Sequence, residues 1–161
     1  RADVALRGET VLLLELCGVD AAHLLFLDDP EIEGLLARCE RLVLVDHNQA
    51  TGRLAALGSK VVEILDHHKD LGAHAQALRK IAFEGEQATA GSCCSLVAEA
   101  CLAANAELLE RAEGAVARAL LGVVLLDTVN LDEKAKKATP RDVAAVAALE
   151  RAAPAPPRSE L

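Results

Sequence analysis

The sequence predicts an α/β fold with a doubly wound, mainly parallel sheet that is flanked by helices. In the first half of the chain, short apolar runs typical of buried strands alternate with segments typical of helices. This alternation is typical of parallel strands joined by right-handed crossovers. Two of the apolar runs also end alike, at Asp46-His47 and at Asp66-His67-His68. Because parallel strands end along a shared edge of their sheet, we expect these two polar ends to form one site there.

The composition is that of a folded domain with an aliphatic core. Of the 161 residues, 52% are hydrophobic but only 1% are aromatic, so Leu, Val and Ala must build the core. We expect one domain over residues 1–153. The prolines within residues 154–161 cannot continue a helix, and we interpret this segment as a linker or tail.

The charge and the cysteines narrow the possible partners and location. A net charge of −8 at pH 7 argues against binding to long nucleic acid, which requires a cationic surface. A phosphorylated substrate stays compatible with this charge, because bound divalent metals reverse the local potential. No apolar run is long enough to cross a bilayer, so no membrane association is expected. The five cysteines include no C-x-x-C pair, which favours reduced thiols and a cytoplasmic location.

The first half of the chain is expected to hold short helices between strands. Residues 9–17 fit either a strand or a helix, and Gly18, a suitable C-cap, favours the helix. Pro30 is expected to open a second helix at its first turn. A brief helix or loop over residues 50–58 ends at Gly58. Four runs predict strands, at residues 23–27, 41–45, 61–65 and 78–83.

Helices are expected to dominate the second half. Gly91-Ser92 is typical of a helix start. The apolar stripe of this helix would consist of Leu96, Val97, Ala100, Cys101 and Ala104. Residues 106–126 predict a long helix, although residues 120–126 would also fit a buried strand. Thr139-Pro140-Arg141-Asp142 has Thr at the N-cap, Pro at N1 and an acid at N3, and it predicts a helix to about residue 152.

The triplet Asp66-His67-His68 is the strongest candidate for a functional site. A carboxylate and two imidazoles at a strand end are poor core residues and good ligands for divalent metals. Successive side chains of an extended segment point in opposite directions, so one histidine could bind metal while the other faces a substrate. The alternative is a solvated turn with two incidental histidines. Three of the five histidines in the chain lie beside the two strand-end aspartates, which favours the metal site.

Two further aspartates follow apolar runs. Asp46 comes after four apolar residues, where a buried carboxylate costs several kcal/mol unless it is paired or bound to metal. The alternative is that Asp46 caps the next turn. Asp127 ends residues 120–126 in the same way and becomes a third ligand candidate beside Asp46 and the triplet.

Two features could bind anions. The helix start at Gly91-Ser92 offers free backbone N–H groups and the positive end of the helix dipole, although most helix starts bind nothing. Near the C-terminus, basic residues gather in an acidic chain, at Lys134, Lys136, Lys137 and Arg141. One interpretation of this cluster is a solvated surface. The more specific alternative is that the cluster binds a chain of phosphates.

Taken in order, these motifs resemble the DHH phosphoesterase superfamily. The matching elements are residues 44–48 (Leu-Val-Asp-His-Asn), 65–70 (Leu-Asp-His-His-Lys-Asp), 91–97 (Gly-Ser-Cys-Cys-Ser-Leu-Val), 126–130 (Leu-Asp-Thr-Val-Asn) and 137–142 (Lys-Ala-Thr-Pro-Arg-Asp). The last two elements and residues 6–9 are most similar to the prune-type exopolyphosphatases. The Asp-His-Asn element is also similar to family II inorganic pyrophosphatases. The resemblance covers nearly the whole chain.

The resemblance implies a phosphoanhydride hydrolase with two Mn²⁺ or Mg²⁺ ions. It would release terminal phosphate from polyphosphate, or act on a pyrophosphate-like substrate, by attack of a metal-bound hydroxide. Asp46 would bridge both metals, and His67 and Asp127 would complete one metal site. His68 would contact the phosphate as a catalytic group, and Asp66 would orient the imidazoles. Substrate contacts are also expected from a further set, Gly91, Ser92, Asn130, Lys137 and Arg141.

One departure from the family limits this expectation. An earlier motif, a His followed by an Asp-x-Asp pair, has no counterpart in residues 1–40, and the first strand and the smaller C-terminal domain are also missing. We therefore expect weak metal binding and slow turnover from the chain as given. Two alternatives stay open. One is a pyrophosphatase or small-nucleotide phosphodiesterase on the same scaffold, and the other is a catalytically silent interaction module. The sequence does not indicate an oligomeric state.

Overall fold

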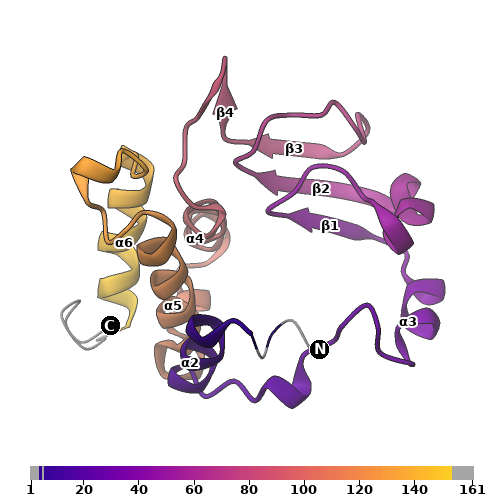
Figure 1. The fold of residues 1–161 in the computed structure, drawn as a ribbon, viewed down its shortest axis with the longest axis horizontal. Helices are drawn as coiled ribbons and strands as arrows, with labels where there is room; N and C mark the ends of the chain where they lie inside the picture. Colours follow the sequence, from indigo (N-terminus) through magenta and orange to yellow (C-terminus); the bar gives the residue numbers. More distant parts are fainter. Residues whose placement is uncertain (1–3, 5, 154–161) are drawn as a thin grey trace. The chain divides into compact units, whose positions relative to one another are not determined.

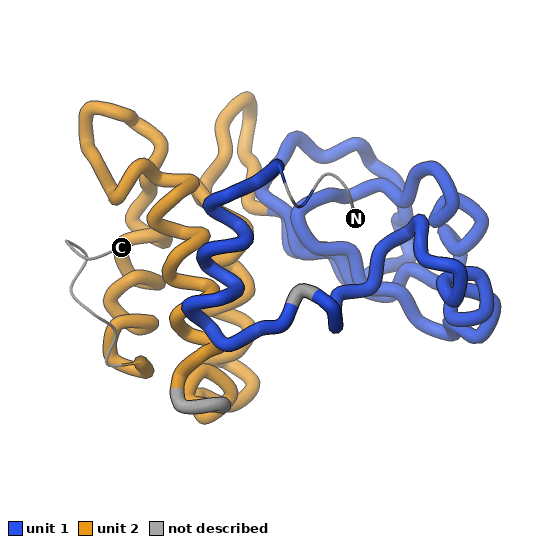
Figure 2. The backbone as a smooth tube through the Cα atoms, turned by 60° about the horizontal axis from the view of Figure 1, so that its bottom comes forward, with its two compact units in different colours: residues 1–81 blue, residues 82–161 orange. Residues whose placement is uncertain are grey.

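The structure, a computed structural model, describes residue 4 and residues 6–153, and the predicted tail at residues 154–161 lies outside them. The chain divides into two compact units, residues 1–81 and residues 82–161 (Figure 2). Each unit has its own hydrophobic core. Among the described residues, no helix combines the length and the hydropathy that a membrane span requires.

The first unit is built on a parallel three-stranded sheet in the order β1-β2-β3 (Figure 1). The strands are β1 (Leu42–Val45), β2 (Val61–Asp66) and β3 (Leu78–Ile81), and the 3₁₀ segment η2 (Gly52–Lys60) joins the first two. Leu44 pairs with Ile64 in register, and both side chains are buried in the core of this unit. The parallel sheet and the α/β class that the sequence predicts are therefore confirmed.

The segment before the sheet is helical, and the sequence predicted this only in part. Helix α2 (Gly8–Leu16) is followed by Gly18 in the left-handed conformation, as expected of a C-cap glycine. The short turn η1 (Ala21–His23) comes next. Helix α3 (Ile32–Arg38) begins two residues after Pro30, so the proline precedes the helix rather than opening it.

The predicted strand at residues 23–27 is wrong. His23 ends η1, and residues 24–26 form no regular element. The reason is local hydrogen bonding. The carboxylate of Asp20 accepts from the backbone N–H of Ala22 at 2.8 Å, and that of Asp29 accepts from the N–H of Phe26 at 2.8 Å. Such side-chain acceptors compete with the ladder that a strand would need.

The second unit is mainly helical (Figure 1). A short antiparallel hairpin, β4 (Phe83–Glu84) and β5 (Gln87–Ala88), precedes α4 (Cys93–Ala104), α5 (Glu107–Asp127), the turn η3 (Glu133–Ala135) and α6 (Pro140–Ala152). The three helices contact one another, and their core includes Leu121, Val124 and Leu149. Residues 120–126 are thus helix and not a strand.

Two sequence predictions for this half need correction. The strand expected over residues 78–83 ends at Ile81, and Phe83 begins the hairpin. In α4, Ala98 is fully buried although it lies outside the predicted apolar stripe, while Ala104, within it, is exposed. Because α4 packs against both α5 and α6, it buries more than one stripe.

Candidate metal centre

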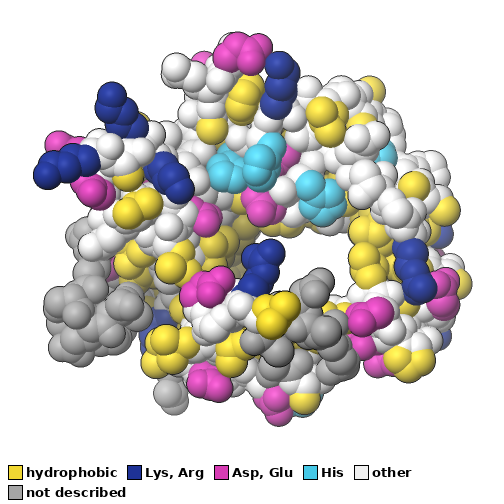
Figure 3. Space-filling model, in the orientation of Figure 1, with side chains coloured by type: hydrophobic (Ala, Val, Ile, Leu, Met, Phe, Trp, Pro, Cys, Tyr) yellow, Lys and Arg dark blue, Asp and Glu magenta, His cyan; other side chains and the backbone are white. Residues whose placement is uncertain are grey.

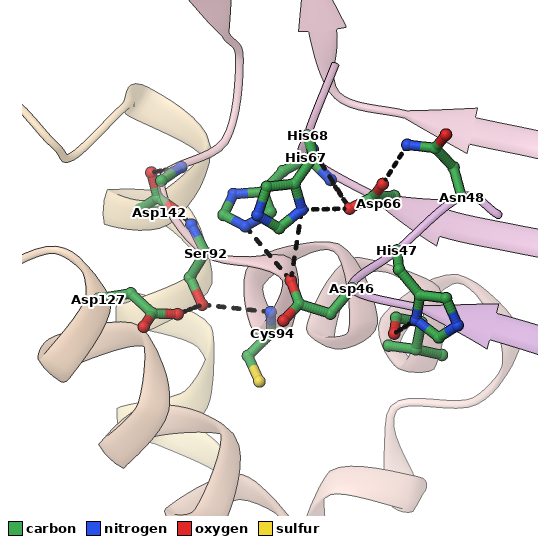
Figure 4. A network of polar contacts seen from close by, with 12 residues as sticks. Asp46, His47, Asn48, Asp66, His67, His68, Ser92, Cys94, Asp127 and Asp142 are labelled. Carbon is green, nitrogen blue, oxygen red and sulfur yellow. Dashed lines mark hydrogen bonds and ion pairs between the residues drawn. The ribbon is translucent and has the colours of Figure 1, made fainter. Parts of the chain in front are cut away.

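Three of the predicted site residues come together in the first unit. Asp46, His67 and His68 each offer one ligand atom, and these atoms lie within 4.8 Å of one another (Figure 4). Asp46 Oδ1 is 3.3 Å from His67 Nε2 and 3.9 Å from His68 Nδ1. Histidine and carboxylate side chains also lie side by side on the surface drawn in Figure 3. The prediction that the two strand ends share one edge is correct for these residues.

The pairing of β1 with β2 explains why these side chains meet. Val45 pairs with Leu65, and one residue later the N–H of Asp46 donates to the carbonyl oxygen of Leu65 at 2.9 Å. Asp46 then adopts a left-handed backbone with φ 66°. This turn leaves its side chain 62% exposed, so Asp46 is not the buried carboxylate that the sequence suggested.

The buried carboxylate is that of Asp66, which has no exposed surface. It accepts from Asn48 Nδ2 at 2.5 Å, from His68 Nδ1 at 2.7 Å and from the backbone N–H of His67 at 2.8 Å. Burial alone raises the pKa of Asp66, but the hydrogen bonds from His68 and Asn48 and from the backbone outweigh burial and lower it. Asp66 is therefore ionised at neutral pH, and it holds the His68 ring in place.

The hydrogen bond to Asp66 distinguishes the two histidines. An ionised carboxylate only accepts, so His68 Nδ1 carries the proton and Nε2 of a neutral ring keeps its lone pair. The His67 side chain is 16% exposed and that of His68 is 60% exposed. His67 Nε2 faces Asp46, whereas His68 has a nitrogen and an exposed edge left for another partner.

The expectation that the two imidazoles point in opposite directions is wrong. Their ring centroids are 4.5 Å apart in an edge-to-face arrangement, and both rings lie beside Asp46. Strand β2 ends at Asp66, so the alternation of a strand no longer applies to the next two residues.

Sequence reasoning gave no role to Asn48. Asn48 is 3% exposed, and its side chain donates to Asp66 and to the carbonyl oxygen of Lys69 (3.1 Å) and accepts from the N–H of Leu71 at 2.9 Å. Asn48 therefore ties the segment after the histidines to the buried carboxylate. Its neighbour His47 is exposed, and its Nδ1 lies 3.0 Å from the carbonyl oxygen of Val45. The signal for Asn48 was its place three residues beyond the end of strand β1, in the Asp-His-Asn element.

Asp127 belongs to the second unit, where it is the last residue of α5. Its exposed side chain accepts a hydrogen bond from Ser92 Oγ at 2.6 Å (Figure 4). An acid at a helix C-terminus opposes the helix dipole, and no basic residue lies in the last turn to compensate it. This position does not stabilise the helix. Its role as a metal ligand stays a prediction.

The helix start at Gly91-Ser92 already holds an anion, the carboxylate of Asp142. Gly91 N–H donates to Asp142 Oδ2 at 2.8 Å and Ser92 N–H donates to Oδ1 at 3.2 Å. These two amides are therefore not free for substrate. A Cβ atom at Gly91 would lie 2.3 Å from the carbonyl oxygen of Lys137, so only glycine fits this close approach.

The other predicted substrate contacts remain predictions. Arg141 forms a bidentate ion pair with Glu99, and this pairing raises the pKa of the arginine. Lys137 is exposed, and basic side chains gather over the segment between α5 and α6 in Figure 3. The exposed Asn130 is the middle of three consecutive left-handed residues, 129–131, a strained conformation for residues other than glycine.

The chain is similar in sequence to known exopolyphosphatases. It is 33% identical to human exopolyphosphatase PRUNE1 over 159 residues, which cover 98% of this chain and 33% of that protein. It is 35% identical to the bovine exopolyphosphatase PRUNE1 over 143 residues, which cover 88% of this chain and 30% of that protein. The chain thus spans about a third of the length of these relatives. No family model matches the chain.

The fold is also found in a crystal structure. A Methanococcus jannaschii protein assigned to the family II inorganic pyrophosphatases matches 91% of this chain and 44% of its own length, with a TM-score of 0.56 and 23% sequence identity. This likeness shows a shared fold. The sequence relatives confirm the predicted relation to the prune-type exopolyphosphatases.

Proposed function

We propose that this chain, a relative of the prune-type exopolyphosphatases, is part of a divalent-metal-dependent hydrolase that releases terminal phosphate from polyphosphate. The observation that carries the proposal is the cluster of Asp46, His67 and His68 at the sheet edge. The names of the sequence relatives support a phosphoanhydride as the substrate.

The donor set of the cluster fits a divalent metal. Asp46 Oδ1 and His67 Nε2 are close enough to share one ion, and they would hold it. A carboxylate suits Mg²⁺ and Mn²⁺ alike, and the imidazole nitrogen favours Mn²⁺ of the two. When bound, the metal would supply an activated water and would offset the charge of the phosphates. Asp127 as a further ligand is a part of the proposal that rests on the sequence motif.

The remaining residues of the cluster position groups and handle protons. Asp66 fixes the His68 ring by accepting from Nδ1. His68 Nε2, when protonated, would donate to a phosphoryl oxygen or to the leaving group. Asn48 keeps Asp66 in place from the other side of the carboxylate. Gly91, Ser92, Asn130, Lys137 and Arg141 were predicted to contact the substrate, and we keep this proposal only for Asn130, Lys137 and Arg141.

Metal binding and phosphate release by the full-length protein test the proposal. Asp46→Asn and His67→Ala should each weaken Mn²⁺ binding, measured by isothermal titration calorimetry, by about 100-fold or more, since even residues behind a ligand contribute about 10- to 100-fold. His47→Ala is the matched control, because His47 adjoins Asp46 but contacts the carbonyl oxygen of Val45. Equal Mn²⁺ affinity in all three variants would refute the proposed centre.

The substrate is tested by comparing phosphate release from long polyphosphate, pyrophosphate and short oligonucleotides. Fastest release from polyphosphate supports the proposal. Faster hydrolysis of pyrophosphate or of oligonucleotides would move the function to another member of the superfamily. Absence of Mn²⁺ binding and of hydrolysis would favour an interaction module. We also expect slow turnover from the 161-residue chain alone, because one described cluster with three ligand candidates is small for two metals.

A further inference from the structure

We propose that Ser92 is a positioning residue that presents the carboxylate of Asp127 as a metal ligand, and that Asp142 holds Ser92 in place. The inference rests on the proposed function, since it assumes that Asp127 binds metal. It replaces the prediction that Ser92 contacts the substrate. All three residues, and the hydrogen bonds that join them, lie within the second unit.

The hydrogen bonds of Ser92 determine where its proton goes. Its Oγ accepts from the backbone N–H of Cys94 at 3.2 Å, as an N-cap does. A cap requires only this acceptor. The hydroxyl proton is donated to Asp127 Oδ2, and the distance of 2.6 Å is typical of a hydroxyl bonded to an ionised carboxylate. One oxygen of Asp127 is thereby fixed, while the side chain stays exposed with its other oxygen available.

Ser92 itself is held from behind by a buried carboxylate. Asp142 has no exposed surface, and it accepts from the backbone N–H of Ser92 at 3.2 Å and of Gly91 at 2.8 Å. On its other side it accepts from the N–H of Thr139 at 2.7 Å and from Oγ of the same residue at 2.8 Å. The start of α4 and the start of α6 therefore share one acceptor. This arrangement allows Ser92, which is also fully buried, little freedom to turn its hydroxyl elsewhere.

Ser95 provides a matched control. It is a serine of the same helix turn, it is fully buried, and its Oγ donates to Asp142 at 2.7 Å. Within the described part of the chain, Ser95 forms no hydrogen bond with Asp127. Loss of the Ser95 hydroxyl therefore perturbs the polar cluster around Asp142 without removing a bond to Asp127. Ser92→Gly complements Ser92→Ala, because glycine is tolerated at an N-cap and lowers the risk that the variant fails to fold.

The test is Mn²⁺ binding by the full-length protein, measured by calorimetry on metal-free protein. Ser92→Ala and Ser92→Gly should weaken binding by about 10- to 100-fold, the usual effect of removing a group that orients a ligand. Ser95→Ala should stay within about 2-fold of wild type, because it does not act on a ligand. In an Asp127→Asn background, Ser92→Ala should have no additional effect.

Two results would overturn the inference. One is an equal loss of affinity in the serine variants at positions 92 and 95, which would mean that both act through the fold alone. The other is a loss from Ser92→Ala that persists in the Asp127→Asn background, which would mean that Ser92 acts elsewhere. Failure of the proposed function is recognised separately, because wild type would then bind no Mn²⁺ and Asp46→Asn would change nothing.

Discussion

Replacement of Asp142 by asparagine should destabilise the protein strongly although the two side chains have the same shape. The carboxylate accepts five hydrogen bonds, from the N–H groups of Gly91, Ser92 and Thr139 and from the hydroxyls of Ser95 and Thr139. Asparagine could keep its oxygen at the Oδ2 position, toward Gly91 and Thr139. Its NH₂ group would then face the N–H of Ser92, and two donors cannot bond each other.

The cost follows from this conflict. One buried N–H without an acceptor costs about 1–3 kcal/mol, and loss of the charge weakens the remaining bonds by roughly half. We expect a loss of about 2–4 kcal/mol, which corresponds to a fall of about 4–16 °C in the thermal unfolding midpoint. Circular dichroism at pH 7 measures this midpoint. Asp132→Asn is the control, because this exposed aspartate also caps a turn and, among the described residues, its carboxylate accepts from the N–H of Lys134 alone.

The result that would refute this reasoning is a small one. If the midpoint of Asp142→Asn lay within about 2 °C of that of Asp132→Asn, the five hydrogen bonds would not contribute as the geometry indicates. An intermediate result would be resolved by Asp142→Ala, which removes every acceptor and should be at least as unstable as the asparagine variant.

The stability that Asp142 contributes should also depend on pH. Burial raises the pKa of Asp142 in the folded state, but its hydrogen bonds outweigh burial and lower this pKa. The contribution is therefore present above the ordinary aspartate pKa of about 3.9 and is lost as the pH falls through the lowered pKa. Urea titrations at a series of pH values should therefore show the advantage over Asp142→Asn shrinking below about pH 4, and an advantage that grew there would contradict this sign. Asn48→Ala should lower the free energy of unfolding by about 1–3 kcal/mol, because it leaves buried hydrogen-bond partners unpaired. As the control in the same denaturation assay, Ala in place of the exposed neighbour Gln49 should change the free energy of unfolding by less than about 0.5 kcal/mol. Gly91→Ala should destabilise the protein, because its Cβ would meet a carbonyl oxygen at 2.3 Å. Gly34→Ala should stabilise the protein by about 0.5–1 kcal/mol, because Gly34 lies in a helix with open space around it. Equal thermal unfolding midpoints for the two alanine variants would contradict the packing argument.

The elements that the sequence predicted correctly carry local signals. The start of α6 is one example, where Thr139, Pro140 and Asp142 occupy the cap, first and third positions as their residue types favour. Strand β2 is another, since an apolar run was enough to place it. The strand predicted at residues 23–27 failed because two aspartate side chains, within three residues of the amides they bond, outweighed the weak β propensity of the run.

In the candidate site, residue types and strand ends were sufficient to bring Asp46, His67 and His68 to one edge. They were not sufficient to show which carboxylate is buried. That depends on Asn48, which lies 18 positions from Asp66 in the chain, and on the left-handed turn at Asp46. The direction of the histidine rings likewise depends on β2 ending at Asp66, a boundary that apolar periodicity does not define to the residue.

The sequence alone thus determined the class of fold, the order of most elements and the residue types of the candidate metal centre, because helix caps, apolar runs and strand ends depend on neighbours in the chain. Only the tertiary structure decided how the polar groups are paired. Asp142 accepts hydrogen bonds from the backbone N–H groups of Gly91 and Ser92, which lie 51 and 50 positions away in the chain, and no local sequence pattern specifies such bonds. A buried carboxylate accepts from whichever donors the packing of helices brings to it, and that packing is a property of the whole fold.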